Sequence, residues 1–111
     1  MRSTITRHKN RYILVESSEP IDIRGRDTSS SMINSIDKQL GEMGRVELNP
    51  KLVFQYNANV FVVRVKRGFE RKAILALSFI KDINGKRVGF YTIKTSGTIR
   101  TLIEYCRKTY R

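Results

Sequence analysis

Four short segments have the apolar patterns that are typical of β-strands. Residues 52–56 alternate between two sets of side chains, which gives this segment two distinct faces. Residues 57–59 (NAN) are turn-prone and predict a hairpin to the apolar run that follows. The four predicted strands are 11–17, 52–56, 60–66 and 87–95.

Three other segments have apolar residues at steps of three and four, which predicts helices with one buried face. The first helix has N-cap candidates at residues 27–31 and should end at Gly41 and Gly44. The second should stop at Asn84-Gly85. The apolar positions are Met32, Ile33, Ile36, Leu40 and Met43 in the first; Phe69, Ala73, Leu77, Ile80 and, in part, Ala76 and Ile83 in the second; and Ile99, Leu102, Ile103, Cys106 and Tyr110 in the third.

The order β-α-β-β-α-β with an added helix is that of the split β-α-β, or ferredoxin-like, arrangement. It predicts a two-layer α+β fold, similar to an RNA-recognition motif, in which strands one and three lie at the centre of a four-stranded antiparallel sheet. One domain spans residues 1–111, with a basic N-terminal arm over residues 1–10. The last helix could bury its apolar stripe on the open face of the sheet or on a partner protein. We favour the sheet, because Gly97 allows a sharp reversal.

The charge is the most informative part of the composition. The chain has 22 Lys+Arg against 10 Asp+Glu, a net charge of +12, and residues 56–111 hold 13 of the bases and only 3 of the acids. Such an excess indicates a polyanionic partner, most often nucleic acid and less commonly an anionic membrane surface. No apolar run approaches the roughly 18 to 20 residues of a membrane span. The first ten residues lack the apolar stretch of a secretory signal, so we expect a cytoplasmic protein.

Little in the sequence indicates catalysis by the chain alone. The one histidine, His8, lies in the basic N-terminal segment, and the one cysteine, Cys106, lies on the apolar face of the last helix. A cysteine on such a face is structural far more often than it is a nucleophile, and nothing in the local sequence would generate a thiolate. HExxH, CxxC, GxSxG and Walker-type motifs are absent from the sequence. We therefore expect neither a catalytic residue nor a cofactor or metal bound by the protein itself.

The turn into the last helix is the strongest candidate for binding phosphate. The first backbone N–H groups of a helix have no internal partners and carry partial positive charge, so an anion is stabilised there. An arginine in the first turn adds a bidentate donor for phosphate oxygens. A plain turn with a solvated arginine is the competing interpretation. The candidate residues are Lys94, Ser96, Gly97, Thr98 and Arg100.

A second basic cluster lies where the third strand meets the second helix. Its residues are Arg64, Lys66, Arg67, Arg71 and Lys72, and a basic helix start is unfavourable unless an anion is bound. The stretch 66–74 begins like an RNA-recognition-motif signature, but Gly68 follows the strand and Phe69 should be a core residue. A base-stacking sheet face has weak support, from Tyr12 and Phe61 alone. Arg24 and Arg26 form a weaker third basic candidate.

Three stretches carry a resemblance to a known family. "RYILVE" at residues 11–16, "RVKRGFERKAILALSFIKDING" at residues 64–85 and above all "SGTIR" at residues 96–100, in this order, size and charge, resemble the Pop-five-type protein subunit of ribonuclease P. The archaeal member is called protein component 2. Residues 18–31 depart most from the family, so no residue roles carry over there. The chain ends soon after the last helix, without the acidic tail of some eukaryotic members, so it looks archaeal.

The resemblance implies a subunit of the endonuclease that removes 5′ leaders from precursor tRNA. It implies that the RNA subunit carries catalysis with bound magnesium ions, and that the protein supports this RNA. Its implied protein partner is a TIM-barrel-like subunit of the Rpp-thirty type, in a dimer of heterodimers. Two other classes stay open: an independent RNA-binding module, and a small phosphate-handling enzyme such as an acylphosphatase. The enzyme needs a glycine-rich anion loop after the first strand, which residues 18–27 do not offer.

Overall fold

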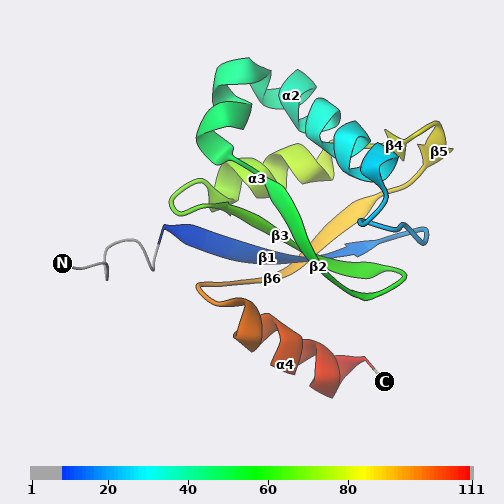
Figure 1. Ribbon diagram of the computed structural model, residues 1–111, viewed down its shortest axis with the longest axis vertical. Coiled ribbons are helices and arrows are strands. Elements are labelled where there is room, and N and C mark those ends of the chain that lie inside the picture. The colour runs from blue at the N-terminus through cyan, green and yellow to red at the C-terminus, as the bar shows by residue number, and fades with distance from the viewer. Residues whose placement is uncertain (1–8, 111) are drawn as a thin grey trace.

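A computed structural model of the protein describes residues 9–110. The basic arm predicted over residues 1–10 lies mostly outside these residues, and His8 lies outside them as well. The elements follow in the order β1 (Asn10–Ser17), α2 (Arg26–Leu48), β2 (Lys51–Asn57), β3 (Val60–Lys66), α3 (Glu70–Ser78), β4 (Asp82–Ile83), β5 (Lys86–Arg87), β6 (Phe90–Ser96) and α4 (Ile99–Thr109) (Figure 1).

The main sheet has four antiparallel strands in the order β2-β3-β1-β6. The first and third predicted strands, β1 and β3, therefore occupy the centre, which confirms the predicted fold class. Asn10 to Glu16 of β1 pair residue by residue with Lys66 to Val60 of β3, with Ile13 opposite Val63 and Leu14 opposite Val62. Because successive side chains of a strand point to opposite faces, these two pairs belong to two different layers.

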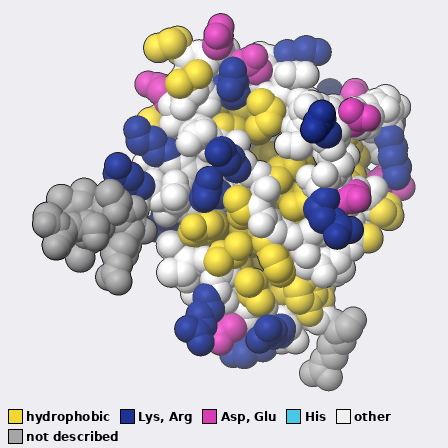
Figure 2. Space-filling view, in the orientation of Figure 1, with side chains coloured by type: hydrophobic (Ala, Val, Ile, Leu, Met, Phe, Trp, Pro, Cys, Tyr) yellow, Lys and Arg dark blue, Asp and Glu magenta, His cyan; other side chains and the backbone are white. Residues whose placement is uncertain are grey.

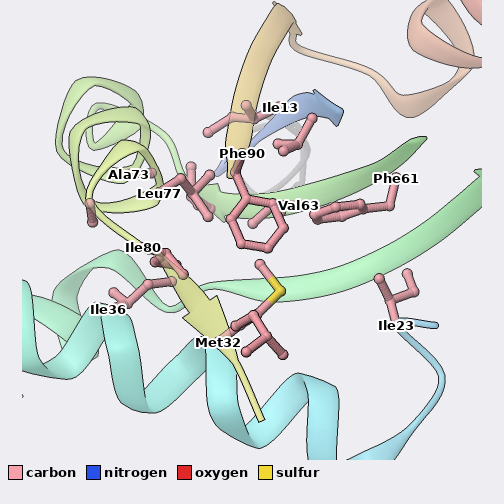
Figure 3. Close-up of a cluster of buried hydrophobic side chains, with 14 of the residues drawn as sticks. Ile13, Ile23, Met32, Ile36, Phe61, Val63, Ala73, Leu77, Ile80 and Phe90 are labelled. Atoms are coloured by element: carbon pink, nitrogen blue, oxygen red, sulfur yellow. The ribbon is translucent and has the colours of Figure 1, made fainter. Parts of the chain in front are cut away.

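One face of the sheet packs against α2 and α3 (Figure 1). Ile13 and Val15 of β1 and Phe61, Val63 and Val65 of β3 are almost completely buried there. Figure 3 shows how the side chains of the two helices meet the sheet residues around the edge-to-face pair of Phe61 and Phe90. The buried helix residues of this core are Met32, Ile36, Leu48, Ala73, Ala76 and Leu77.

The opposite face is covered by α4, which forms a third layer (Figure 1). Leu102 and Cys106 are fully buried against Leu14, Val60 and Val62. The favoured place for the last helix is thus confirmed, but the reason given for it was wrong. Gly97 has no positive φ, and a Cβ atom built on it would meet no atom within 4 Å. The reversal into α4 uses ordinary backbone that other residues could adopt.

Helix α2 differs from its prediction at both ends. Its N-cap is Gly25, which offers no side-chain acceptor, so none of residues 27–31 caps it. Gly41 breaks the helix as expected, with φ 80° and ψ 166°, but helical structure resumes and runs through Gly44 to Leu48. Asn49, with a left-handed φ of 48°, ends it and donates its N–H to the Arg45 carbonyl.

Helix α3 is shorter than predicted, because it ends at Ser78. Ile80 and Ile83 are buried in the first core although they lie beyond the helix. Asn84 and Gly85 form the turn of a small hairpin between β4 and β5, not a helix stop, and both have positive φ values, 54° and 79°. This combination is typical of a tight type I′ hairpin turn. Arg87 belongs to β5, so the last strand of the main sheet starts only at Phe90.

Candidate nucleic-acid interface

The antiparallel pairing brings both predicted basic clusters to one end of the sheet. Tyr12 of β1 lies opposite Arg64 on one side and opposite Ser96 on the other. Because neighbouring strands are about 4.8 Å apart, the backbones at Arg64 and Ser96 are separated by about 10 Å. We call this end, where β1 begins and β3 and β6 finish, the basic end. It carries Arg64, Lys66, Arg67, Arg71, Lys72, Lys94 and Arg100.

The β3–α3 turn at the basic end is held by the backbone and by one carboxylate. Gly68 has a φ of 94°, which a residue with a side chain adopts only with strain. Its N–H donates to Glu70 Oε1 at 2.5 Å. The other oxygen of Glu70 lies 3.6 Å from Arg11 Nε, and the Arg67 N–H donates to the Lys9 carbonyl. Glu70 is therefore already occupied, so it does little to neutralise the exposed cations.

Two lysines flank the aromatic residue of this turn. The Nζ atoms of Lys66 and Lys72 lie 6.0 Å and 5.6 Å from the centre of the Phe69 ring. Phe69 is partly buried against the first core, which confirms that it is not a free stacking platform. It holds two ammonium groups near the start of α3, where the helix dipole adds further positive potential.

At the second turn, the hydroxyl groups organise the start of α4. Thr98 is the N-cap, as predicted, and its Oγ1 accepts from the Thr101 N–H at 3.4 Å. Ser96 Oγ accepts from the Thr98 N–H at 3.2 Å. The amides of Ile99 and Arg100 have no acceptor within the helix, so they are the donors left for an anion. Ser96 and Thr98 therefore shape this site more than they contact a ligand.

Positive charge gathers at the basic end from both faces of the sheet. Helices α3 and α4 both begin there, one on each face of the sheet. Figure 1 shows the turns that lead into them at the same end of the sheet, beside the start of β1. Lys and Arg side chains lie along that end in Figure 2. The ion pairs found within residues 9–110 use Arg11, Arg24 and Arg45 only. The predicted cations are thus free to contact an anionic ligand.

The individual side chains differ in exposure. Lys66, Arg67, Arg71, Lys94 and Arg100 are exposed, whereas Arg64 is half-buried. The ammonium group of Lys94 lies 5.6 Å from the ring centre of Tyr105 on α4. Sequence reasoning missed Lys51, which pairs with Arg64 and lies at the same end. The signal was available, because a hairpin through residues 57–59 places the start of one strand beside the end of the next.

The third basic candidate does not join this surface. Arg26 opens α2, and Arg24 lies in the loop after β1, beyond the opposite end of the sheet. The Arg24 side chain is exposed, with its Nε 3.4 Å from Asp22 Oδ1. These two arginines therefore serve better as a comparison than as part of the site.

Base stacking on the sheet, weakly supported by the sequence, is contradicted by the structure. Phe61 is fully buried in the core beneath α2 and α3. Tyr12 faces the other layer, where it is partly buried with the residues that pack against α4. An RNA-recognition motif needs exposed aromatic rings on an open sheet face, and α4 covers that face here.

The described residues offer few groups for catalysis. Among residues 9–110 there is no group of three or more His, Cys, Asp and Glu side chains that could hold a metal ion. No helix in this part of the chain is long and apolar enough to cross a membrane. Burial raises the pKa of the Cys106 thiol, which disfavours the nucleophilic thiolate and agrees with the predicted structural role.

We expect Cys106 to react with thiol reagents only when the protein unfolds. Its folded-state pKa lies above the value of an exposed thiol, so the thiolate is scarce at pH 8 and the sulfur is 0% exposed. Absorbance of the dye released from Ellman's reagent should rise within minutes in concentrated urea and stay near baseline in buffer. Fast labelling of the native protein would mean that α4 detaches readily from the sheet.

Comparison with known proteins identifies the family. The model of the Rpp14/Pop5 family matches residues 11–107. Ribonuclease P protein component 2 of Pyrococcus horikoshii is 33% identical over 97 residues, covering 86% of this chain and 81% of the relative. The protein of the same name from Methanocorpusculum labreanum is 27% identical over 96 residues, covering 86% of this chain and 65% of the relative, slightly under two thirds of its length.

A solved structure agrees on the fold. A chain in the cryo-EM structure of yeast ribonuclease MRP superimposes with a TM-score of 0.65 over 98% of this chain and 97% of that chain. At 8% identity, this similarity concerns the fold alone. The family match, together with the named relatives, confirms the resemblance seen in the sequence. The two relatives are ribonuclease P protein components, and the chain belongs to the Rpp14/Pop5 family.

Proposed function

We propose that this chain acts as a protein subunit of ribonuclease P and that the basic end is the surface with which it binds the RNA of that enzyme. The observation that carries the proposal is the pairing of Tyr12 with both Arg64 and Ser96. This pairing joins two clusters, more than 20 residues apart in the sequence, into one positive surface with two helix N-termini. Phosphate groups are the ligands that such a surface favours.

The mode of binding follows from what the basic end lacks. Its sheet face is covered by α4, and its aromatic residue Phe69 is packed into the core. Recognition through backbone phosphates positions a protein on RNA but does not read the bases. The basic end therefore suits a subunit that supports a folded RNA. We propose that the RNA carries catalysis with its magnesium ions, and that the protein itself is not catalytic. We also propose that the protein is cytoplasmic.

We further propose that the protein partner is a TIM-barrel-like subunit of the Rpp-thirty type, in a dimer of heterodimers. The exposed apolar residues of the described chain support a contact with a protein. Met43 is 75% exposed and Val46 is 58% exposed, both in the part of α2 that follows the Gly41 break. Exposed apolar groups of this kind are typical of contacts between subunits.

Of the alternatives, the phosphate-handling enzyme loses support. Such an enzyme would need free backbone amides in the loop after β1. Here those amides donate to acceptors of the protein itself: Ile21 to Ala58 O, Ile23 to Gln55 Oε1, Arg24 to Asp22 Oδ1 and Gly25 to Asp22 O. An independent RNA-binding module remains the second candidate, because the basic end would serve it equally well.

Reconstituted cleavage of precursor tRNA tests the proposal. We expect no cleavage by the protein alone and faster cleavage by the cognate ribonuclease P RNA when the protein and its partner subunit are added. The rate should be measured over a range of magnesium and salt concentrations, since phosphate contacts weaken as salt rises. A heat-treated sample of the same protein controls for added charge.

Two outcomes would contradict the proposal. Hydrolysis by the pure chain would make it an enzyme in its own right. Tight RNA binding without any effect on the rate, with the partner present, would favour the independent RNA-binding module.

A further inference from the structure

A concave site lies at the opposite end of the sheet from the basic end. It is an open pocket of about 550 Å³ between the β4–β5 hairpin, the loop after β1 and the end of α3. Its floor consists of Ile80, Val88 and Phe90, which are buried. We call it the hairpin pocket, and its rim carries Ser18, Glu19, Lys81, Arg87, Gly89 and Tyr91.

Hydrogen bonds from three separate segments hold the walls of the hairpin pocket. The Ser18 N–H donates to the Gly89 carbonyl at 2.9 Å, and the Gly89 N–H donates to Ser18 Oγ at 2.8 Å. Lys86 Nζ donates to the Pro20 carbonyl at 3.3 Å, and the Asn84 N–H donates to Ser31 Oγ at 3.2 Å. A two-strand hairpin has little stability alone, so these bonds fix its position. The pocket is therefore shaped before any ligand arrives.

Tyr91 places an aromatic ring on the rim. Its side chain is 60% exposed, whereas the neighbouring Phe90 is 5% exposed in the core. The ring lies across Gly89, because a Cβ atom at that position would be 3.3 Å from the Tyr91 hydroxyl oxygen. Glycine at position 89 thus leaves room for the ring beside the strand. The ring offers a flat surface to a ligand in the pocket.

The charges around the ring favour an anion. Lys81 and Arg87 are exposed rim residues, and neither forms an ion pair within the part of the chain that the structure describes. The one carboxylate on the rim belongs to Glu19. An aromatic ring, two cations and an apolar floor match the parts of a nucleotide. The base would stack, and the phosphate would pair with the cations.

We infer that the hairpin pocket binds an unpaired nucleotide of RNA, with its base stacked on Tyr91 and its phosphate held by Lys81 and Arg87. The concave shape requires a base that is not stacked in a helix, since bases inside an RNA duplex present only their edges. The Glu19 carboxylate would accept a hydrogen bond from an N–H group of the base. This inference rests on the proposed RNA-binding function and adds a second point of contact to it.

The position of the pocket supports a single RNA that touches both ends of the sheet. Tyr91 and Ser96 lie on the same strand, β6, about 17 Å apart at the usual rise per residue. Exposed Lys94 lies between them. Strand β6 is the edge strand of the sheet, so a nucleic-acid strand can run along it from the hairpin pocket to the basic end.

A hexauridylate that contains one 2-aminopurine tests the inference, since the fluorescence of this base falls when it stacks. Binding to the full chain should quench the fluorescence, and Tyr91→Ala should abolish the quenching and weaken affinity about tenfold. Tyr91→Phe should keep both, because it retains the ring. Arg87→Ala should weaken affinity. At a saturating protein concentration it should still quench the fluorescence as far as the unmodified protein does, because it keeps the Tyr91 ring. Lys38→Ala, which removes one charge from α2, is the matched control and should change neither.

The outcomes separate this inference from the proposed function. Unchanged quenching and affinity in both Tyr91→Ala and Arg87→Ala, with normal melting curves, would overturn the nucleotide site. The basic end could still bind ribonuclease P RNA in that case, which the same RNA-binding assay with the Arg67 and Arg100 variants measures. Loss of binding to the protein partner in Tyr91→Ala, with RNA binding intact, would also overturn the inference and assign the pocket to a protein contact.

Discussion

Replacing Leu102 with alanine should lower the free energy of unfolding of the lone protein by about 2 to 5 kcal/mol. Leu102 is 0% exposed and lies between α4 and the sheet, against Leu14, Val60 and Val62. Removing its isopropyl group leaves a cavity that the surrounding buried side chains fill only in part. Urea denaturation followed by circular dichroism measures the change directly.

A surface leucine provides the control for this experiment. Leu75 lies on α3 and is 55% exposed, so Leu75→Ala should change the unfolding free energy by only about 0.5 kcal/mol. Equal stability of Leu102→Ala and the unmodified protein, combined with weaker binding to the partner subunit, would show that α4 packs on a partner in solution. The three-layer arrangement would then be wrong for the free chain.

The second large effect concerns RNA binding. The double variant Arg67→Ala/Arg100→Ala removes one exposed cation from each turn of the basic end. Each lost phosphate contact should reduce the slope of log affinity against log salt by roughly 0.7 to 0.9 units, so the pair should flatten it by about 1.5. The affinity for ribonuclease P RNA should be measured by filter binding at five or more salt concentrations. Each single variant should show about half of the effect.

The control variant carries the same loss of charge at another place. Arg24→Ala/Arg26→Ala removes two arginines near the start of α2, away from the basic end. It should leave the salt slope nearly unchanged. A double variant of Arg67 and Arg100 that behaves like this control would show that the basic surface is merely solvated, or that the RNA binds elsewhere.

Local sequence signals predicted the strands well and the ends of the helices poorly. The apolar run 60–66 gave β3 at its observed bounds, because a buried central strand has no competing pattern. At α3 the period of three and four continued through Ile80 and Ile83, since both are buried in the same core after the helix has ended. The Asn84-Gly85 pair was a hairpin signal, but the adjoining strands have only two residues each.

The candidate site was predicted in its parts but not as a whole. Each turn was recognised from its charge and its helix start, which are local properties. Their joining at one end depends on the pairing of β1 with both β3 and β6, and no local pattern contains that information. The hairpin pocket could not be predicted, because it needs the loop after β1 beside a hairpin more than 60 residues later.

The central strands are buried on both faces, so hydrophobic burial alone does not fix how they align with their neighbours. In most sheets a slip of one residue is prevented because it would move apolar side chains into water. Strand β3 has no such safeguard over Val60–Val63, where both faces are apolar and buried. Alignment then depends on the polar turn before it: Asn57 Oδ1 accepts from the Asn59 N–H, and Asn59 Nδ2 donates to the Ser17 carbonyl on β1. Asn59, although outside every core, thus specifies which side chains enter which layer.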